Sequence, residues 1–334
     1  MFPLLHRRKS HPPHCRLPAV LTCRVRDYST SYDVRNAVSP SYGKRENSAT
    51  VFVWIGETFI NRVNDDPYHK SISSRYDTSV KWLKESLKEA RHVQRTVIVT
   101  GGSRGIGRAT ALLLAAHGWD IVVNYANNHD EAASVVAEIV GRGGRANAVR
   151  ADVSSAAEMK ALFDQAEGAY GKVNALVSSA GIIRPSLIKD LDDAGLSEQL
   201  DTNLRGTING MREAARRIVD GGRIVSISST TLALNPPGYG IYNATKAAIE
   251  ALTRVLAKEL GSRRITVNAV APGPVETDLF VTGKSQTEID RMAQAAPFKR
   301  LGQPQDIAEV VAFLLSDAAG WVNGQVVRAN GGLA

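Results

Sequence analysis

The sequence predicts an α/β fold built on one doubly wound parallel sheet of seven strands, with helices on both faces. Three observations lead to this prediction. Short runs of β-branched and other apolar residues recur along the chain from residue 94 onward. Most of these runs are apolar throughout rather than alternating, as expected for strands buried on both faces. Segments with the apolar spacing of amphipathic helices lie between them, and strands that alternate with helices favour a parallel sheet.

The first predicted strand is the run TVIVT, from Thr96 to Thr100, and a glycine-rich turn leads from it into a helix. The later strands are expected at Asp120–Asn124, Arg145–Val153, Asn174–Ser178, Arg223–Ser228, Ile265–Val270 and Gln325–Ala329. Further helices are expected at Asp130–Gly143, Ala156–Tyr170, Asn203–Val219 and Tyr242–Leu260. All of these elements fall within residues 94–334, which we interpret as one domain.

Residues 1–93 form an N-terminal extension of different composition. Residues 1–26 contain six Lys/Arg and no Asp/Glu, which fits a mitochondrial or plastid targeting segment over residues 1–28. If this segment does not direct import, we expect a cytoplasmic protein. The polar stretch that follows, to residue 77, lacks periodicity and is expected to be mostly disordered. A short helix is expected at about residues 79–92, from its apolar spacing.

The formal net charge of +8 lies in the extension, because residues 1–95 hold 17 Lys/Arg against 9 Asp/Glu. The rest of the chain is neutral, which argues against nucleic-acid binding. No apolar run approaches the roughly 20 residues that span a bilayer, so we expect no membrane segment. Both cysteines, Cys15 and Cys23, lie in the extension, where we interpret the HPPHC run as a polar tract. We therefore predict neither a disulfide-stapled fold nor a metal site.

The stretch TGGSRGIG follows the first predicted strand and opens a helix. Its glycines allow a sharp turn and a close approach of the backbone to a pyrophosphate, and the helix N-terminus offers free N–H groups. A glycine-rich turn on its own is often only a turn. Its position after the first strand of a parallel sheet favours Rossmann-type dinucleotide binding. The candidate cofactor ligands in this loop are Gly101, Ser103, Arg104, Gly105, Ile106 and Gly107.

The end of the second predicted strand indicates which dinucleotide binds. Enzymes that use NAD usually carry an acidic residue there for the ribose 2′-hydroxyl, whereas this chain reads NYANN. Arg104 adds a cation, which suits a 2′-phosphate, so we predict NADPH/NADP+; the alternative is that Arg104 only faces solvent. Asp152, after the third strand, is expected to accept from the adenine amino group or else to cap its loop. The candidate ligands in NYANN are Asn124, Tyr125, Ala126 and Asn127.

A tyrosine and a lysine lie four residues apart in GIYNATK, as Tyr242 and Lys246. On a helix this spacing puts both side chains on one face. A free phenol has a pKa of about 10, poorly matched to proton transfer at neutral pH, and a nearby ammonium is expected to lower it. The alternative is a packed tyrosine beside a solvated lysine. Asn243 opens a glycosylation sequon in the same helix, which we interpret as accidental.

Taken in order, these motifs resemble those of the short-chain dehydrogenase/reductase family. The glycine loop, Asp152-Val153, Asn203, the pair Ser228-Ser229, YNATK and APGPVET occur in the family order and cover residues 94–334. Each motif alone is weak, since a tyrosine–lysine pair arises readily by chance, but the ordered set is specific. The resemblance extends to NADPH-dependent 3-oxoacyl-[acyl-carrier-protein] reductases and, through NYANN, to trihydroxynaphthalene reductases.

The resemblance implies a catalytic set of Asn203, Ser229, Tyr242 and Lys246. In the family, the matching tyrosine protonates the carbonyl oxygen while the reduced nicotinamide delivers hydride to its carbon, and the matching lysine also holds the nicotinamide ribose. Ser229 precedes Tyr242 by thirteen residues and would orient the carbonyl, with Ser228 as its competitor. Asn203 would support a water chain from the lysine to solvent; simple exposure of this asparagine is the alternative.

The resemblance also implies further cofactor contacts. The segment after the sixth strand would hold the nicotinamide carboxamide, unless it is an ordinary proline turn, and the family's Asn-Asn-Ala-Gly is Ser178-Ser179-Ala180-Gly181 here. We expect this departure to loosen the loop without removing activity. The residues that the resemblance adds to the cofactor set are Val153, Ala180, Gly181, Pro272, Gly273, Val275 and Thr277, together with Tyr242 and Lys246.

We therefore predict an NADPH-dependent reductase of ketones, aldehydes or 3-oxoacyl thioesters. An NADP+-dependent dehydrogenase of secondary alcohols or sugars and a non-catalytic NADP-binding scaffold are the alternatives. Specificity is expected in a mobile, partly apolar lid at residues 274–303. Arg212, Arg216 and Arg217 would offer a basic approach for an acyl carrier protein, unless they are ordinary solvated charges. A homotetramer or dimer is expected from the resemblance, formed by packing the two long helices against partners.

Overall fold

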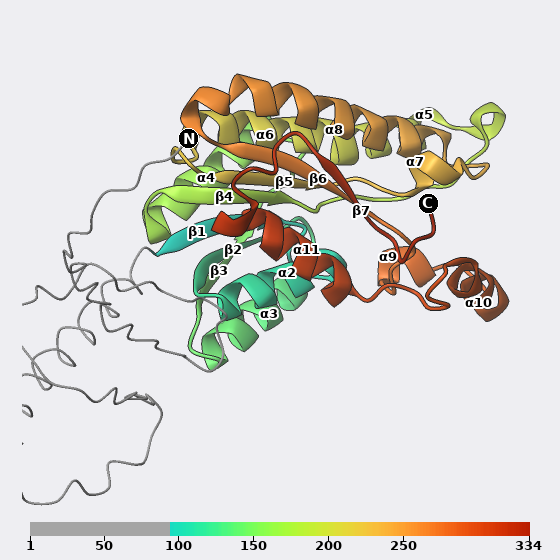
Figure 1. The fold of residues 1–334 in the computed structure, drawn as a ribbon, viewed down its shortest axis with the longest axis horizontal. Coiled ribbons are helices and arrows are strands. Elements are labelled where there is room, and N and C mark those ends of the chain that lie inside the picture. Colours follow the sequence, from blue (N-terminus) through green and yellow to red (C-terminus); the bar gives the residue numbers. More distant parts are fainter. Residues whose placement is uncertain (1–93) are drawn as a thin grey trace, which may run out of the picture. The chain divides into compact units, whose positions relative to one another are not determined.

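The computed structural model describes residues 94–334, which build a layered α/β structure around one parallel sheet (Figure 1). The strands are β1 (Arg95–Thr100), β2 (Trp119–Tyr125), β3 (Arg145–Arg150), β4 (Val173–Ser178), β5 (Arg223–Ile227), β6 (Thr266–Pro272) and β7 (Val326–Ala329). The seven strands are ordered β3-β2-β1-β4-β5-β6-β7, and each pairing is parallel. The predicted doubly wound sheet is confirmed.

Helices cover both faces of this sheet. On one face lie α2 (Gly105–Ala116), α3 (His129–Gly141) and α11 (Pro304–Leu315), and on the other lie α4 (Ala156–Tyr170), α6 (Gly206–Arg217) and α8 (Gly240–Glu259) (Figure 1). The remaining short elements are α5 (Asp193–Gln199), α7 (Thr231–Leu234), α9 (Asp278–Val281), α10 (Gln286–Ala295), η1 (Ile188–Asp190), η2 (Leu200–Arg205), η3 (Gly261–Arg263) and η4 (Asp317–Ala319).

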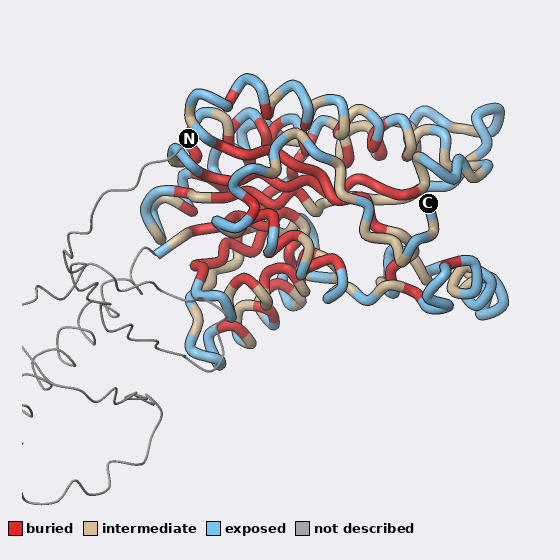
Figure 2. The backbone as a smooth tube through the Cα atoms, in the orientation of Figure 1, coloured by how far each residue is buried: buried red, intermediate tan, exposed pale blue. Residues whose placement is uncertain are grey.

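Strand β1 explains why the apolar runs are continuous. Val97 and Val99 pack in one core cluster with α2, α3 and α11, whereas Ile98 packs in the other cluster with α4, α6 and α8. All three side chains are fully buried, because successive residues of a strand point to opposite faces and both faces are covered. Figure 2 shows the same result for the sheet as a whole, with buried backbone concentrated in the strands.

Two parts of the helical pattern differ from the prediction. The helix expected at Asn203–Val219 is preceded by α5 and opens with the π-helical segment η2 before α6 begins at Gly206. The helix α11 was missed, although Pro304 stands at its first position and Asp306 completes a capping box with Gln303, both of which are helix start signals. The boundaries of β3 and β7 are shorter than predicted.

Several predictions concern residues 1–93, which lie outside the described residues: the targeting segment, the disordered stretch, the short helix and the HPPHC tract. Within residues 94–334, no helix combines the length and the apolar character needed to cross a bilayer. The same residues contain no group of His, Cys, Asp and Glu side chains placed to hold a metal ion.

Candidate active site

The glycine loop lies between β1 and α2, and its backbone packs so closely that side chains are excluded. A Cβ at Gly107 would lie 2.2 Å from the carbonyl oxygen of Gly101, and one at Gly101 would lie 2.8 Å from the Cα of Ala180. Gly101 and Gly105 also have φ of +62° and +54°, in the left-handed region that favours glycine. The loop is therefore a backbone cradle beside Ala180, as a pyrophosphate site requires.

The cradle also meets the segment that follows β6. A Cβ at Gly105 would lie 3.2 Å from the Cγ2 of Thr277, and one at Gly273 would lie 2.9 Å from the Cβ of Asn330. Helix α2 opens after Arg104, which is extended and exposed. The structure thus brings together the first and last parts of the predicted cofactor set, although they are more than 150 residues apart.

The loop after β4 is held by a residue that the sequence did not single out. The Thr100 hydroxyl accepts from the backbone N–H of Ser179 at 3.1 Å and of Ala180 at 3.3 Å. The hydroxyl of Ser178 is buried and has no hydrogen-bond partner among residues 94–334. Thr100 therefore fixes Ser179 and Ala180 through their backbone, and the hydroxyl of Ser178 is left without a partner among the described residues.

The predicted 2′-phosphate edge is only partly formed by the residues expected there. The side-chain amide of Asn124 is buried and donates to the carbonyl oxygens of Ala151 at 2.9 Å and Val149 at 3.3 Å, so it joins β2 to β3 rather than facing a ligand. Arg150, which the sequence reasoning missed, donates from Nε to the carbonyl of Ala126 at 3.0 Å. Arg150 ends β3, and in the sheet it pairs with Tyr125 of the NYANN segment. A basic residue at the end of the third predicted strand was the sequence feature that could have indicated its place.

Other residues at this edge have structural partners. The Asp152 carboxylate accepts from the backbone N–H of Ser154 at 2.9 Å. This bond favours the alternative in which Asp152 caps its loop. Val153 packs in the core beside Gly206, where a Cβ would lie 2.5 Å from the valine Cγ2. Tyr125 makes an edge-to-face contact with His129. Asn127 is exposed and stays available to a ligand.

Tyr242 and Lys246 lie on one face of α8, as predicted, and both are buried. The Lys246 ammonium donates to the carbonyl oxygen of Ile227 at 2.8 Å and lies 5.5 Å from the centre of the Tyr242 ring. The alternative of a solvated lysine is therefore wrong. The pair stands against the end of β5, where a carbonyl oxygen rather than a carboxylate receives the ammonium.

The pKa values of this pair run opposite to the expectation. Burial raises the pKa of Tyr242 to about 12, the hydrogen bond with Ser229 acts to lower it, and Tyr239 raises it further. Burial lowers the pKa of Lys246 to about 8. Desolvation disfavours the charged form of both groups, and the ammonium points at Ile227 rather than at the phenolic oxygen. The prediction that Lys246 lowers the Tyr242 pKa is not met by this arrangement.

The two serines after β5 have different roles. Ser228 donates its hydroxyl hydrogen to the Glu250 carboxylate at 2.8 Å, so this hydrogen is already used within the chain. The Ser229 Oγ accepts from the backbone N–H of Thr231 at 3.2 Å and lies 2.9 Å from the Thr231 Oγ1, and Ser229 acts to lower the pKa of Tyr242. Of the two serines, Ser229 is therefore the one beside Tyr242, and its role toward a carbonyl stays a prediction.

Asn203 lies in the π-helical segment η2 and is fully buried. Its Oδ1 accepts from the backbone N–H of Ile182 at 2.8 Å, and its Nδ2 donates to the carbonyl of Ile182 at 2.9 Å. A Cβ at Gly181 would lie 3.3 Å from the Asn203 Oδ1 and 3.7 Å from the Lys246 Nζ. The alternative of an exposed asparagine is therefore wrong. The side chains of Asn203 and Lys246 both lie next to Gly181.

The predicted lid is anchored at a narrow neck. Val275 pairs with Gly302 in a parallel bridge, and the side chain of Gln303 donates to Glu276 at 2.7 Å. Between these anchors, α9 and α10 extend away from the sheet (Figure 1). Leu279 on α9 and Phe298 in the segment after α10 are exposed. The lid therefore presents apolar side chains from a fixed base.

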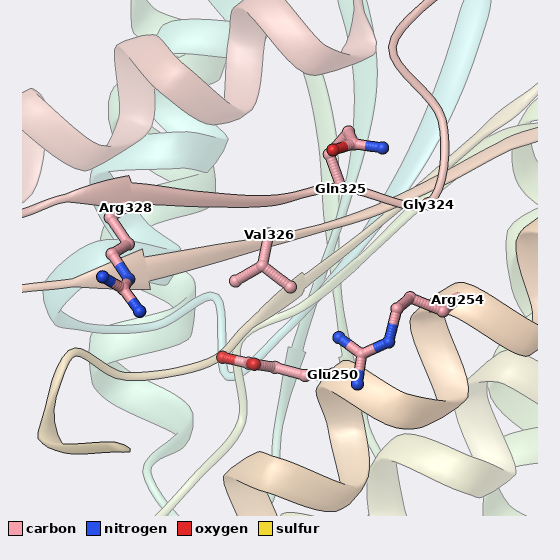
Figure 3. A pocket seen from close by; sticks show the side chains of 6 residues that line it. All are labelled: Glu250, Arg254, Gly324, Gln325, Val326 and Arg328. Carbon is pink, nitrogen blue, oxygen red and sulfur yellow. The ribbon is translucent and has the colours of Figure 1, made fainter. Parts of the chain in front are cut away.

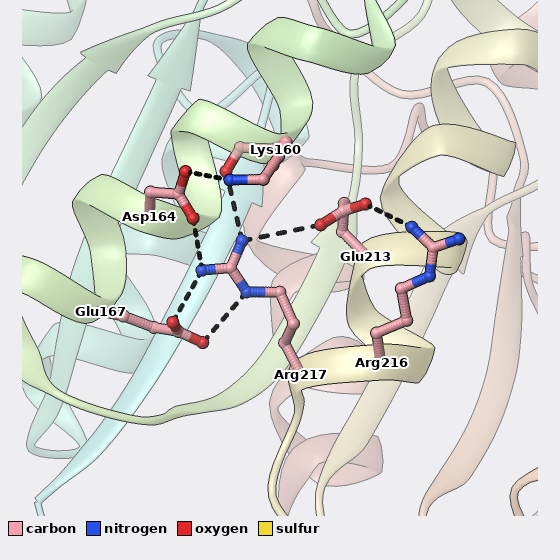
Figure 4. Close-up of polar contacts among 6 residues, drawn as sticks. All are labelled: Lys160, Asp164, Glu167, Glu213, Arg216 and Arg217. Carbon is pink, nitrogen blue, oxygen red and sulfur yellow. Dashed lines mark hydrogen bonds and ion pairs between the residues drawn. The ribbon is translucent and has the colours of Figure 1, made fainter.

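The arginines expected to receive a carrier protein are engaged within the chain. Arg217 forms ion pairs with Asp164, Glu167 and Glu213 (Figure 4), and these partners raise its pKa above the usual range. Arg216 pairs with Glu213 from the other side. Arg212 donates to Asn209 at 2.9 Å. The ion pairs join α4 to α6 and compensate the charges of Arg216 and Arg217, whereas Arg212 is exposed beside a neutral amide.

A separate hollow of about 540 Å³ lies between α8 and β7. Figure 3 shows Glu250 and Arg254 reaching from α8 toward the strand that carries Val326 and Arg328. None of the predicted catalytic or cofactor residues lines it. The hollow therefore belongs to the open edge of the sheet rather than to the site.

The chain matches known proteins over most of the described residues. The family model described as enoyl-(acyl carrier protein) reductase matches residues 101–334. The chain is 44% identical over 253 residues to NADPH-dependent aldehyde reductase 2, chloroplastic, of Arabidopsis thaliana, covering 71% of this chain and 93% of that protein. It is 39% identical over 243 residues to a 3-oxoacyl-[acyl-carrier-protein] reductase of Staphylococcus epidermidis, covering 72% and 99%.

A solved structure gives the same result for the fold. A short-chain dehydrogenase from Burkholderia cenocepacia in complex with NADP is 35% identical, with a TM-score of 0.69, and the match covers 72% of this chain and 98% of that one. The uncovered part of this chain corresponds in length to its N-terminal extension.

Proposed function

Because this chain belongs to the short-chain dehydrogenase/reductase family and is an NADP-dependent oxidoreductase, we propose that it reduces the carbonyl group of an aldehyde, a ketone or a 3-oxoacyl thioester to an alcohol. One observation carries the proposal: Ser229, Tyr242 and Lys246 are buried together. Ser229 lies close enough to the phenol to act on its pKa, and the Lys246 ammonium lies 5.5 Å from the centre of the phenol ring.

The cofactor fits the cradle that the glycine loop forms. Gly107 packs directly on the Gly101 carbonyl, so the loop folds tightly without side chains there, and its backbone N–H groups would meet the phosphates. When bound, NADPH supplies the hydride. The residues that would hold it are those of the glycine loop, with Arg104 for the 2′-phosphate, Gly181 and Lys246 for the riboses and Thr277 for the carboxamide.

The protonation state of Tyr242 favours reduction. With a pKa raised to about 12, the phenol keeps its proton at neutral pH and can donate it to the developing alkoxide. Oxidation of an alcohol needs the phenolate, which burial disfavours. Ser229 would donate a hydrogen bond to the same carbonyl oxygen. Asn203, close to Lys246 across Gly181, would support a water chain that returns the proton.

The lid supports an apolar carbonyl substrate. Leu279 and Phe298 are 41% and 71% exposed, and these apolar surfaces can be covered when a substrate binds beneath them. The relative in Arabidopsis thaliana is named for aldehyde reduction. Since Arg217 and Arg216 are ion-paired, docking of an acyl carrier protein on α6 has little support, and we place aldehydes and ketones first among substrates.

We further propose that the chain forms a homo-oligomer through the outer faces of α6 and α8. Ile208 on α6 is 38% exposed and Val255 on α8 is 55% exposed, and a shallow groove between the two helices is lined mainly by apolar side chains. A second copy of the same two helices would cover these surfaces in a dimer or tetramer. Analytical ultracentrifugation of the wild type and of Val255→Glu tests this assembly.

Import into an organelle is also a proposal. Two of the plant relatives are named as chloroplastic, and residues 1–28 have the basic composition of a targeting segment. Mass spectrometry of the N-terminus in cells, with fractionation of the organelles, decides the point. An intact Met1 in the cytoplasm would contradict import.

The proposed reaction is tested by following NADPH consumption with a panel of aldehydes, ketones and acetoacetyl thioesters. We expect turnover with at least one apolar carbonyl, and the variant Tyr242→Phe should lower kcat by about 10²–10⁴-fold while NADPH binding is kept. Turnover only with alcohols and NADP+ would favour the dehydrogenase alternative. Tight NADPH binding with no turnover of any compound would favour the scaffold.

A further inference from the structure

Asn330, the first residue after β7, makes four hydrogen bonds through its side-chain amide. Its Oδ1 accepts from the backbone N–H groups of Gly332 at 3.1 Å and of Leu333 at 3.2 Å. Its Nδ2 donates to the main-chain oxygen of Ala334 at 2.9 Å and to the hydroxyl oxygen of Thr230 at 3.2 Å. The amide therefore folds the chain after β7 into a turn and ties this turn to Thr230.

The neighbours of this amide fix its orientation. The Thr230 hydroxyl donates its own hydrogen to the carbonyl of Ala271 at 3.1 Å, so its oxygen accepts from Asn330. On the other side, two backbone N–H groups require an acceptor. A reversed amide would place donors against donors and acceptors against acceptors. Because Thr230 directly follows Ser229, the amide links the turn to the segment that carries this serine.

Asn330 also packs against the segment after β6, which is expected to hold the nicotinamide carboxamide. A Cβ at Gly273 would lie 2.9 Å from the Cβ of Asn330. The backbone N–H of Gly273 donates to the carbonyl of Ala329 at 3.0 Å, and that of Thr230 donates to the carbonyl of Pro272 at 2.9 Å. Asn330 therefore stands where the chain leaves three neighbouring strands, β5, β6 and β7.

The lid contacts residues 330–334, which we call the tail segment. A Cβ at Gly331 would lie 3.4 Å from the Cδ2 of Phe298, and one at Gly332 would lie 3.2 Å from the Cγ of Pro297. Both lid residues follow α10, so this end of the lid lies against the two glycines. The contact is a second support for the lid, in addition to the neck at its base.

We propose that Asn330 is a positioning residue, which holds the tail segment as a support for Pro297 and Phe298 and so sets the place of the lid relative to Ser229. This inference rests on the proposed function, because it assigns the lid to the substrate and Ser229 to the carbonyl. Asn330 acts on the lid through the two glycines and on the serine segment through Thr230. Without its amide, substrate binding has to order the lid, and the apparent affinity falls.

Hydrogen exchange followed by mass spectrometry tests this support without any substrate. Asn330→Ala keeps the Cβ that packs on the segment after β6, and it should speed amide exchange in α10 and in residues 296–300 by about 3- to 10-fold. Asn330→Asp keeps the size and an accepting oxygen but has no hydrogens for Thr230 and Ala334. It should therefore speed the exchange at least as much as the alanine.

Asn323 offers a matched control at the other end of β7. It also precedes a glycine, its Oδ1 accepts from the backbone N–H of Val267 at 2.9 Å, and its Nδ2 donates to the carbonyl of Ala257 at 3.2 Å. Asn323→Ala therefore removes an amide with similar bonds, but one that has no contact with the tail segment. It should leave the exchange of the lid unchanged.

A second variant tests whether Asn330 acts through the lid contact. Phe298 is 71% exposed, so Phe298→Ala should fold, and it should speed lid exchange by itself. The double variant with Asn330→Ala should exchange no faster than the faster single variant, because both changes remove the same support. If Asn330→Ala does not fold, Asn330→Asp takes its place in this comparison.

The kinetic test uses the best apolar carbonyl compound of the panel. Asn330→Ala should raise KM about 3- to 10-fold, while kcat and the Kd for NADPH change by less than about twofold, because the packing on Gly273 is kept. Asn323→Ala should leave KM unchanged.

Unchanged lid exchange in either Asn330 variant or in Phe298→Ala, an equal rise in Asn323→Ala, or independent effects in the double variant would overturn the inference. A wild type that turns over no carbonyl compound, but shows the expected exchange pattern, would count against the proposed function alone.

Discussion

The ammonium of Lys246 lies 5.5 Å from the centre of the Tyr242 ring and gives its hydrogen to the carbonyl oxygen of Ile227. The lysine therefore donates to the backbone of β5 rather than to the phenol. Both groups are buried, and burial moves the two pKa values toward the neutral forms, to about 12 for the tyrosine and about 8 for the lysine. Burying the Lys246 ammonium therefore lowers the free energy of unfolding of the protein.

Replacing Lys246 by methionine should stabilise the protein while it abolishes turnover. Because the pKa of Lys246 is lower in the folded chain than in the unfolded one, the unfolded state binds the proton more tightly. The penalty on folding is full below about pH 8 and disappears as the pH rises toward the ordinary value of 10.5. At pH 7 we expect a gain of about 1–3 kcal/mol in the free energy of unfolding.

Chemical denaturation at several pH values measures this effect. The difference between Lys246→Met and the wild type should shrink between pH 8 and pH 10.5. A variant that is less stable than the wild type at pH 7 would show that the bond to Ile227 outweighs the burial of the charge.

Arg104 should decide between the two dinucleotides. Its guanidinium is exposed at the start of α2, and a charge-assisted bond to a 2′-phosphate contributes about 1.5–3 kcal/mol. Arg104→Ala should therefore weaken NADPH binding by about 10- to 100-fold and change NADH binding by less than about twofold. Arg108→Ala is the matched control, since this arginine lies on the same helix and pairs with Glu138. Fluorescence titration of both cofactors gives the constants; equal losses for NADPH and NADH would exclude a 2′-phosphate contact.

A methyl group at Gly107 should damage both the fold and the cofactor site. The added Cβ would lie 2.2 Å from the Gly101 carbonyl oxygen, so the backbone of the cradle has to move. Gly107→Ala should lose about 2 kcal/mol or more of stability together with dinucleotide binding. In Gly168→Ala, on α4, the new Cβ has no atom of the described residues within 4 Å, and a gain of up to about 1 kcal/mol is expected. Thermal unfolding with and without NADPH compares the pair, and similar effects of both changes would contradict the close-packing argument.

Arg217 should contribute far more to stability than its neighbour Arg216. The Arg217 side chain is 17% exposed and meets three carboxylates, among them Glu213, which is 8% exposed. Removing the arginine leaves a buried carboxylate with less compensation, and Arg217→Ala should cost about 2–4 kcal/mol. Arg216 is 65% exposed, and Arg216→Ala should cost less than about 1 kcal/mol. Urea denaturation measures the free energy of unfolding of both variants. Equal losses in the two variants would show that the ion pairs of Arg217 in Figure 4 contribute no more than an exposed pair.

Much of the site could be predicted because its signals are local. The continuous apolar run of β1 indicates burial on both faces of the sheet. The glycines of the loop indicate a backbone packed too closely for side chains. The spacing of Tyr242 and Lys246 reports a shared helix face. Each of these depends on residues within a few positions of one another, where chain geometry alone relates sequence to structure.

The rest depended on residues that are distant in the chain. Nothing near Asn124 shows that its amide turns inward to β3, nor does the sequence around Arg217 show that α4 supplies its carboxylates. The same holds for the π-helical turn that buries Asn203. It also holds for the hydrogen bonds between Thr231 and Asn243, which form only when α7 and α8 pack together.

The sequence by itself determined the alternation of strands and most of the helices, the tight glycine turn and the shared helix face of Tyr242 and Lys246, because these follow from local backbone and side-chain chemistry. Only the tertiary structure decided how those groups are charged and aimed. Burial depth and hydrogen-bond direction are properties of the assembled interior, so the raised pKa of Tyr242 and the orientation of Ser229 depend on surroundings contributed by several elements at once.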